Sequence, residues 1–312
     1  MKLSIFVHRL LHKTIIVLSL CLVSTCQNAR KSDHAHIYST TLRPDGSKIH
    51  WSLSGNNIEN KNQVLLIAQG SGCAPARTSE NVLLMASAAP EFSILTIEKY
   101  GVELPSSLDG SLTSCSQEFF NNHTITQRVH DAQTVFKDLD SRGLWNGKTV
   151  LFGGSEGGAV VSILSHALPE TDAVIVFSTG TGLTMAEFFP MVVPPDFAKQ
   201  MTLVFDDIRT NPNATGMAAG NSYKWWRDIL DRRLSDDLLK SKVPILLVHG
   251  VNDKSGPVEA ARATEAAFIS AKKSDQLTYW EMKDRDHQMN DPEGHSHMEG
   301  VLKDVAGWIE QQ

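Results

Sequence analysis

The chain has 312 residues, which is enough for one large α/β domain or two small ones. Hydrophobic residues make up 41% and charged residues 21% of it, the composition of a globular protein with a sizeable core. The formal charge of −6, with no run of basic residues, argues against nucleic acid and anionic membrane surfaces as partners. We therefore set both classes of partner aside.

The first 26 residues have the pattern of a secretory signal peptide. They carry three basic residues and no acidic one, and residues 15–23 form an apolar run too short to span a bilayer comfortably. We expect a signal peptide over residues 1–26 that is removed, and an anchor that stays attached is the alternative. Removal takes away only positive charge, so the mature chain is more acidic than the whole chain.

The end of this segment, "LVSTC", resembles the lipobox of bacterial lipoproteins, with Cys26 as the acylated residue. Thr25 departs from the usual small residue before the cysteine, so plain cleavage shortly after Cys26 is the alternative. Both routes export the chain from a bacterial cytoplasm. We expect a periplasmic protein that meets the outer membrane only through the leader or a lipid on Cys26.

Apolar runs typical of buried strands alternate with helical patterns after a polar tether. A hairpin is expected around the turn at Asp45-Gly46. The other expected strands cover residues 64–70, 92–100, 148–154, 172–180, 243–250 and 277–282. The expected helices cover residues 78–89, 124–143 and 155–168, a segment from 258 onward, and a last segment ending at 308. Continuous apolar strands separated by helices predict a mostly parallel sheet of about eight strands, covered on both faces.

Residues 183–240 break this alternation. They are rich in Phe, Met, Trp and Pro, and we expect a helical cap inserted into the main domain. Phe188, Phe189, Trp225 and Trp226 are candidates for the apolar wall of a substrate pocket. The alternative is that they form only the small core of the insertion itself.

The stretch "LFGGSEGGAV" places Ser155 among glycines, between a buried strand and a helix that begins at Glu156. A strand–turn–helix setting is the one in which such a serine forms a nucleophile elbow. The tight turn strains the backbone of the serine, and the glycines remove collisions with strand and helix. A plain turn that happens to contain a serine is the alternative. A base and an acid placed near Ser155 would distinguish a nucleophile from such a turn.

A serine hydroxyl is a weak nucleophile without a base. Asp253 follows the strand at 243–250, and His287 follows the strand at 277–282. Both therefore lie at carboxyl ends of strands, on the same edge of the sheet as Ser155, where α/β sheets place their sites. This pattern predicts an acid, a base and a nucleophile in one site.

Other residues compete for these roles. His295 and His297 lie near His287, but their stretch fits the solvated entrance of the final helix. His249 lies within a strand end and fits a packed residue. An acid at position 284 or 286 would take over the orienting role if Asp253 only formed a turn.

Three motifs together resemble the α/β-hydrolase superfamily: the elbow at residues 153–158, the His-Gly-x-x-Asp stretch at 249–253, and Asp286-His287. The resemblance covers nearly the whole mature chain. Within the superfamily the chain is most similar to exported bacterial esterases, dienelactone-hydrolase-like proteins and prolyl-oligopeptidase-like catalytic domains. It implies an α/β-hydrolase domain over residues 27–312 that contains the cap insertion.

The resemblance also implies an oxyanion hole built from two backbone amides. One is the amide of Glu156, directly after the nucleophile. The other comes from the loop "AQGSGCAPAR", where Ser71 is the corresponding residue and Gly72 a close alternative. Gln69 takes the place that a histidine has in families with a His-Gly pair.

These residues predict a serine hydrolase that cleaves small-molecule carboxylic esters through an acyl-enzyme. A prolyl-oligopeptidase-type peptidase, a thioesterase or an acyltransferase are the enzymatic alternatives, and a binding protein on an inactive hydrolase fold is the other. No organic cofactor is implied, and no metal either, since the four cysteines lack zinc-type spacing. The sequence leaves the oligomeric state open.

The remaining expectation is a disulfide between Cys73 and Cys115. Once the leader is gone, they are the only cysteines apart from Cys26. Export places them in an oxidising compartment, where disulfides persist. Their loops should both emerge on the catalytic edge of the sheet, and two free buried thiols are the alternative.

Overall fold

The computed structural model describes residues 35–55, 58, 61–103 and 114–312. They belong to one compact unit that begins at His34. The expected signal peptide at residues 1–26, with the lipidation candidate Cys26, lies outside the described residues. No helix in the described part of the chain is long and apolar enough to cross a membrane.

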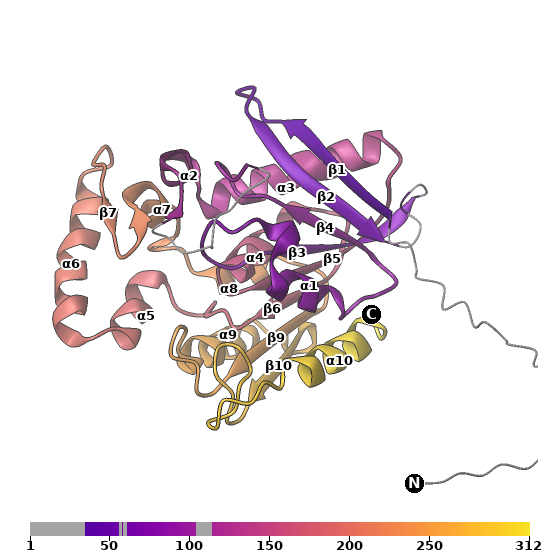
Figure 1. Ribbon diagram of the computed structural model, residues 1–312. Coiled ribbons are helices and arrows are strands. Elements are labelled where there is room, and N and C mark those ends of the chain that lie inside the picture. The colour runs from indigo at the N-terminus through magenta and orange to yellow at the C-terminus, as the bar shows by residue number, and fades with distance from the viewer. Residues whose placement is uncertain (1–34, 56–57, 59–60, 104–113) are drawn as a thin grey trace, which may run out of the picture. The chain divides into compact units, whose positions relative to one another are not determined.

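An eight-stranded sheet runs through the molecule in the order β1-β2-β4-β3-β5-β6-β9-β10 (Figure 1). The strands are β1 (Ala35–Leu42), β2 (Lys48–Gly55), β3 (Asn62–Ala68), β4 (Ser93–Ile97), β5 (Trp145–Gly154), β6 (Thr171–Phe177), β9 (Ile245–Gly250) and β10 (Leu277–Met282). The pairs β1–β2 and β2–β4 are antiparallel, and all the others are parallel. The predicted mostly parallel sheet of about eight strands is confirmed.

Helices cover both faces of this sheet. They are α1 (Glu80–Ala86), α2 (Gln117–Asn122), α3 (Ile125–Ser141), α4 (Glu156–Ala167), α9 (Val258–Ser270) and α10 (Met298–Ile309). The side chain of Thr124 accepts the amide of Gln127 and so caps the start of α3. Gly143, with a φ of 66°, turns the chain after its end, as expected from the sequence.

The alternation of side chains along β3 shows how the two faces differ. Val64, Leu66 and Ala68 pack into the larger core cluster, which α3, α4 and α9 cover. Leu65 and Ile67 point the other way, into a second cluster closed by α1 and α10. Because both faces are buried, the strand reads as one continuous apolar run.

Strand β4 is shorter than the run at residues 92–100 predicts. It ends at Ile97, because the next two side chains are used for polar contacts. Glu98 accepts the amides of Ala76 and Arg77 at 2.6 and 3.3 Å. Lys99 turns toward the loop after β3. The chain therefore leaves the sheet where its side chains bind backbone groups of a neighbouring loop.

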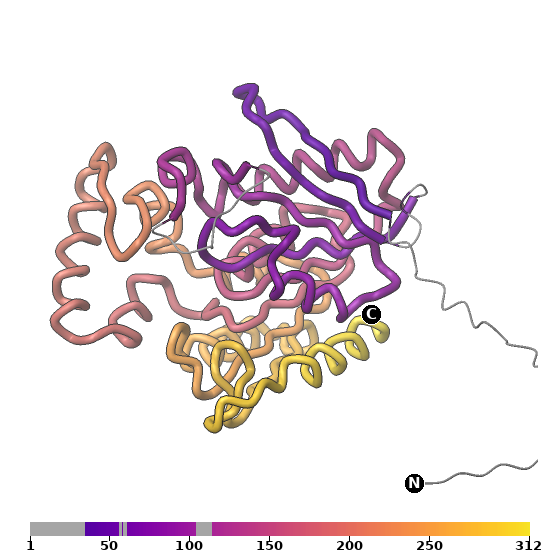
Figure 2. The backbone as a smooth tube through the Cα atoms, in the orientation of Figure 1, coloured from indigo at the N-terminus to yellow at the C-terminus, as the bar shows by residue number. Residues whose placement is uncertain are grey.

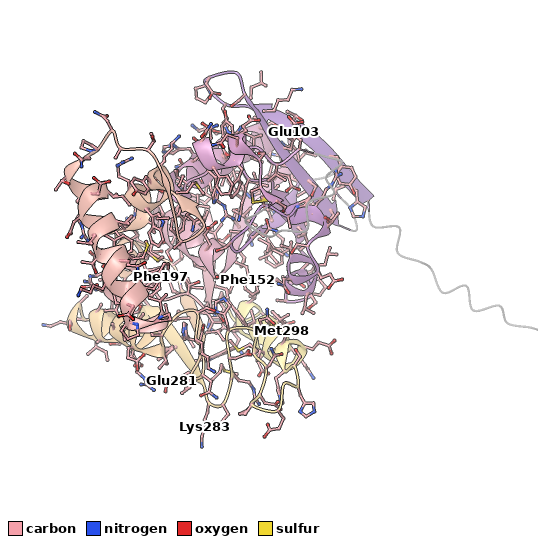
Figure 3. The ribbon with its side chains drawn as sticks, turned by 60° about the vertical axis from the view of Figure 1, so that its left-hand side comes forward. Glu103, Phe152, Phe197, Glu281, Lys283 and Met298 are labelled. Carbon is pink, nitrogen blue, oxygen red and sulfur yellow. A yellow bond between two sulfur atoms is a disulfide. The ribbon has the colours of Figure 1, made fainter. Side chains whose placement is uncertain are left out.

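Most of residues 183–240, the segment expected to form a helical cap and called the cap below, lies to one side of the main sheet (Figure 2), but its last helix lies beside α4 (Figure 1). The cap contains α5 (Met185–Val192), α6 (Pro195–Thr210), α7 (Tyr223–Ile229) and α8 (Leu234–Leu238). It also contains β7 (Met217–Ala218) and β8 (Asn221–Ser222), a small hairpin that the sequence does not predict. Figure 3 shows Phe197 on this cap and the buried Phe152 of β5 among the side chains of the main sheet.

Candidate active site

Ser155 occupies the turn between β5 and α4, with φ of 53° and ψ of −124°. A non-glycine residue seldom adopts positive φ, and such strain persists only where the surroundings enforce it. The Ser155 amide donates to the Phe177 carbonyl at 2.9 Å and so ties the turn to β6. A Cβ at Gly157 would collide with the carbonyl of Ala68, so the turn needs glycine there. The turn has the geometry of a nucleophile elbow.

Asp253 and His287 form a direct pair. Nδ1 of His287 lies 2.7 Å from Oδ2 of Asp253. Because an ionised carboxylate only accepts hydrogen bonds, Nδ1 carries the proton, and Nε2 is left as the basic nitrogen. The other carboxylate oxygen accepts the amides of Ser255 and Gly256 at 2.8 and 2.9 Å. Asp253 therefore orders its turn with one oxygen and orients the imidazole with the other.

These contacts also set the charge of Asp253. Burial alone would raise the pKa of its carboxyl. The hydrogen bond from His287, the positive charge that this ring can carry and the Gly256 amide outweigh burial, so the pKa of Asp253 is lowered. The carboxylate is ionised at neutral pH, as a group that stabilises an imidazolium must be.

The competing histidines are placed elsewhere. His249 is fully buried, and its Nε2 donates to the Gly256 carbonyl at 2.9 Å. Burial lowers the pKa of His249, which keeps the ring neutral behind Asp253. His295 and His297 lie 3.4 and 3.0 Å from Asp291 at the surface. Only His287 shares a cavity with Ser155 among the described histidines.

The competing acids do not reach His287 in the way Asp253 does. Asp286 accepts the amides of Gln288 and Asn290, both at 2.8 Å, with one carboxylate oxygen. Its other oxygen accepts a hydrogen bond from the side-chain amide of Asn290 at 3.2 Å. Asp284 is exposed and has a positive φ of 56°. Asp286 therefore orders the loop that carries His287, and Asp253 accepts the hydrogen bond that orients the His287 ring.

Ser155 and His287 line a cavity of about 440 Å³ beneath the cap. All four candidate aromatic residues of the cap line it too: Phe188, Phe189, Trp225 and Trp226. Phe189 and Trp226 also pack edge to face with ring centroids 5.4 Å apart. The cap aromatics therefore serve both as a pocket wall and as part of the core of the insertion, so the two alternatives are not exclusive.

A second cavity, of about 570 Å³, meets the first at Ser155 and His287. Its wall is more polar and includes Asn81, Gln288 and Asn290. Ser178 lines both cavities, is buried and has a positive φ of 49°. Its hydroxyl has no hydrogen-bond partner among the residues that the structure describes. Sequence reasoning missed Ser178, whose only signal is its place directly after β6.

Two residues at the wall of these cavities have backbone amides without a partner among the described residues. Within the described ranges, neither the Ser71 amide nor the Glu156 amide donates to a protein acceptor. Ser71 lines both cavities and Glu156 lines the first one. Free amides beside a nucleophile are what an oxyanion hole requires. The two residues predicted for this role are thus both at the cavity wall.

A buried charge cluster, which the sequence analysis did not predict, lies behind these amides. Oε1 of Glu156 accepts hydrogen bonds from Arg128 at 2.9 Å and His123 at 3.1 Å, and it pairs with Lys99 at 3.3 Å. All four side chains are at most 8% exposed. Two signals were available in the sequence: Lys99 ends an apolar strand run, and Arg128 interrupts the apolar face of the helix around it.

The same cations hold the loop that contains Ser71. Nζ of Lys99 donates to the carbonyls of Gly70 and Gly72 at 2.5 and 2.7 Å. Nη2 of Arg128 donates to the carbonyl of Gln69 at 2.7 Å. Three carbonyls in a span of four residues are therefore bound by buried positive charge.

Glu156, Lys99 and Arg128 stay charged at neutral pH, whereas burial lowers the pKa of His123 below its usual value and so favours the neutral ring. Burial raises the pKa of Glu156, but Lys99, His123 and Arg128 together hold it well below its usual value. Burial lowers the pKa of Lys99 to about 8, against the opposing attraction of Glu156. A buried carboxylate and a buried ammonium each need the other, because an unpaired buried charge is costly.

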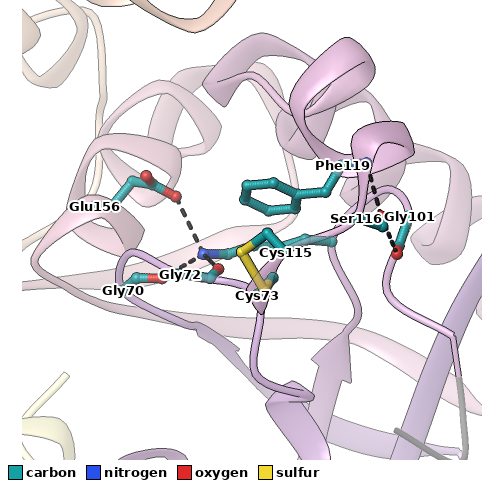
Figure 4. Close-up of a disulfide and its surroundings, with 9 residues drawn as sticks. Gly70, Gly72, Cys73, Gly101, Cys115, Ser116, Phe119 and Glu156 are labelled. Atoms are coloured by element: carbon teal, nitrogen blue, oxygen red, sulfur yellow. Dashed lines mark hydrogen bonds and ion pairs between the residues drawn. A yellow bond between two sulfur atoms is a disulfide. The ribbon is translucent and has the colours of Figure 1, made fainter. Parts of the chain in front are cut away.

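The predicted disulfide between Cys73 and Cys115 is confirmed, with the two Cα atoms 5.6 Å apart. It packs against Phe119 of α2 in a small buried cluster. Figure 4 shows the disulfide beside Gly70, Gly72 and Glu156. The bridge therefore ties the loop that carries Ser71 to the segment before α2. Within the described part of the chain, no group of three or more His, Cys, Asp or Glu side chains is arranged to hold a metal ion.

No protein-family model and no curated protein sequence matches the chain. Solved structures do. Est1E from Butyrivibrio proteoclasticus, in a structure with ferulic acid bound, is 18% identical with a TM-score of 0.61, and the match covers 88% of this chain and 98% of that one. An esterase from Pyrococcus furiosus is 12% identical with a TM-score of 0.58, covering 90% of this chain and 92% of that one.

The chain has the α/β-hydrolase fold. A puromycin-hydrolyzing peptidase from Mycobacterium tuberculosis is also similar, with a TM-score of 0.63 at 13% identity. That match covers 90% of this chain but 40% of the peptidase. Likenesses at such low identity extend to the fold, and one fold hosts many chemistries. The function must therefore be argued from the site.

Proposed function

We propose that the protein is a serine hydrolase that cleaves carboxylic esters. One observation carries the proposal: a positive-φ serine in a strand–turn–helix elbow shares a cavity with a histidine whose Nδ1 lies 2.7 Å from a buried aspartate. A packed structural serine needs neither the strained backbone nor the oriented base. A binding protein on an inactive fold would have no reason to keep all three groups together.

The reaction follows from these positions. His287 removes the proton of the Ser155 hydroxyl as its oxygen attacks the ester carbonyl, and Asp253 stabilises the imidazolium that forms. The amides of Ser71 and Glu156 bind the oxyanion of the tetrahedral intermediate. His287 then protonates the departing alcohol. Water attacks the acyl-enzyme by the same route, which releases the acid and restores the serine.

The two cavities favour an ester whose acyl group is apolar and whose alcohol is polar. The cavity under the cap is walled by Phe188, Phe189, Trp225 and Trp226, which suits an apolar or aromatic acyl group. The second cavity presents Asn81, Gln288 and Asn290, which suits a polar alcohol. The similar structure of Est1E holds ferulic acid, an aromatic acid, which supports the aromatic option for the acyl half.

A peptidase is the second candidate. It is favoured by the similarity in fold to the puromycin-hydrolyzing peptidase, whose own chain is much longer. Thioesterases and acyltransferases can use the same elbow, and the substrate panel described below includes them. Export to the periplasm remains part of the proposal, and the disulfide supports it, because disulfides are rare in reducing compartments.

The experiment is a substrate panel on wild type and Ser155→Ala side by side. A fluorophosphonate probe should label wild type and not Ser155→Ala, which separates an enzyme from a binding protein. p-Nitrophenyl esters, aminoacyl-nitroanilides and acyl thioesters then distinguish esterase, peptidase and thioesterase, and release of an acylated alcohol instead of free acid would indicate a transferase. Turnover of nitroanilides above esters would overturn the esterase assignment, and absence of labelling would overturn the enzyme assignment.

A further inference from the structure

One peptide group links the buried charge cluster to the proposed oxyanion hole. The peptide between Gly70 and Ser71 carries the carbonyl that Lys99 binds at 2.5 Å, and it also carries the Ser71 amide. In a planar trans peptide the C=O and N–H bonds point in opposite directions. A group that fixes the carbonyl therefore fixes the direction of the amide as well.

We infer that Lys99 is a positioning residue that aims and polarises the Ser71 amide toward the oxyanion of the acyl-transfer intermediate. This inference rests on the proposed function. Lys99 does not touch substrate in this role. It acts from the far side of the peptide, where its charge draws electron density toward the Gly70 oxygen and leaves the Ser71 N–H a stronger donor.

The contacts and burial of the Lys99 ammonium support this role. An ammonium has three donors, and here they have three acceptors: the carbonyls of Gly70 and Gly72 and the carboxylate of Glu156. The side chain is 0% exposed, so water does not compete for these bonds or screen the charge. A lysine needed only to neutralise a carboxylate would have no reason to bind two carbonyls of the oxyanion loop.

Glu156 joins the two halves of the oxyanion hole. Its backbone supplies the second proposed donor, and its carboxylate holds Lys99 at 3.3 Å and Arg128 at 2.9 Å. Arg128 in turn holds the Gln69 carbonyl. The distance between the Ser71 and Glu156 amides is therefore set by a short chain of buried, charged contacts. Such preorganisation lets donors stabilise developing charge without rearranging.

The same geometry decides between Ser71 and Gly72 as the donor. The carbonyl on the peptide of the Gly72 amide is that of Ser71, and it accepts no hydrogen bond within the described residues. The Gly72 carbonyl that Lys99 binds belongs instead to the peptide of Cys73. Of these two amides, only that of Ser71 lies on a peptide whose carbonyl is bound by a cation, which assigns the role to Ser71.

The test compares Lys99→Met, which keeps the length of the side chain without its charge, with wild type. Outright loss of one oxyanion donor costs roughly 10²–10³ in kcat, so loss of its positioning should cost about 10- to 100-fold with KM changed less than about 3-fold. Inhibition by a trifluoromethyl ketone, which forms a tetrahedral oxyanion on Ser155, should weaken by the same factor as kcat. Inhibition by the product acid, which resembles the ground state, should change little.

Two further variants separate positioning from stability. Lys99→Gln removes the same charge as Lys99→Met but keeps an N–H donor for the loop carbonyls, so it should retain more of kcat than Lys99→Met. Arg43→Met breaks another buried pair, in which Arg43 lies 2.8 Å from Asp131, and should lower stability with kcat unchanged. If Lys99→Met fails to fold, the milder Lys99→Gln carries the comparison.

The outcomes distinguish the two proposals. Ser155→Ala with wild-type activity would overturn the serine mechanism itself. An inactive Ser155→Ala together with a Lys99→Met whose kcat and ketone affinity match wild type would overturn the role of Lys99 alone. A loss of kcat that follows the loss of stability equally in Lys99→Met, Lys99→Gln and Arg43→Met would show that Lys99 acts only through the stability of the fold.

Discussion

Nδ1 of His287 lies 2.7 Å from Oδ2 of Asp253, although the two residues are 34 positions apart in the chain. The contact depends on β9 and β10 being parallel neighbours, because their carboxyl ends then meet at one edge of the sheet. The contact engages Nδ1 and leaves Nε2 of His287 as the basic nitrogen, and His287 and Ser155 line the same cavity.

Replacement of Ser155 by alanine should abolish hydrolysis while the protein stays folded. Loss of a triad serine typically costs on the order of a million-fold in turnover, because no other group can form the acyl-enzyme. The measurement is ester turnover together with a thermal melt. A variant that retained even a tenth of wild-type activity would contradict the assignment of the nucleophile.

His287→Ala should be as damaging as Ser155→Ala, and the double variant should be no worse than either single one, since the groups act as a unit. His295→Ala and His297→Ala serve as matched controls, because both rings pair with Asp291 at the surface. They should leave kcat unchanged. An inactive His295→Ala or His297→Ala would mean that the base had been assigned to the wrong histidine.

Trp225→Ala should change the preference between short and long acyl chains, because Trp225 lines the cavity under the cap. Phe205→Ala is the matched control. Phe205 is buried in the cap, and its ring centroid lies 5.1 Å from that of Trp226, but Phe205 does not line that cavity. It should lower stability by about 3–5 kcal/mol and leave the ratio of kcat/KM values between chain lengths unchanged. Equal loss on all esters in Trp225→Ala would favour a purely structural role.

Reduction of the Cys73–Cys115 disulfide should lower both the melting temperature and turnover. A bridge between cysteines 42 positions apart stabilises a fold by about 4 kcal/mol in the chain-entropy model. Turnover should fall as well, because Cys73 lies two residues after Ser71. Thiol titration of the unfolded, unreduced protein should find neither cysteine, and a Cys73→Ser/Cys115→Ser variant should be insensitive to reductant.

Acid should destabilise wild type more steeply than Glu156→Gln. The folded pKa of Glu156 lies well below the ordinary value of 4.5, so the stabilisation is present above pH 4.5 and is lost as the pH falls through the folded pKa. Glu156→Gln lacks this carboxylate and should be less stable at pH 7, with the gap to wild type closing on acidification. Chemical unfolding at several pH values measures the free energy of unfolding of both proteins. A difference between wild type and Glu156→Gln that stays constant as the pH falls would contradict the ion-pair account.

Local patterns made much of the molecule predictable from sequence. The apolar runs gave the strands because a parallel sheet buries both faces, and the glycines around Ser155 marked a turn that only small residues allow. Asp253 and His287 could be proposed because each follows a strand, and parallel strands bring such positions to one edge. Cys73 and Cys115 could be paired because the sequence offers few other cysteines.

Only the tertiary structure revealed what lies behind and above Ser155. Lys99 follows β4, Arg128 lies in α3 and Glu156 begins α4. Nothing in their local sequence says that Lys99 and Arg128 come within 3.3 Å of one carboxylate oxygen of Glu156. Whether Trp225 faces a cavity or a core depends on how the cap packs on the sheet. Sequence specifies which side chains a strand or helix presents, whereas buried charge pairs and cavities arise where distant elements meet, and those meetings are decided by the packing of the whole domain.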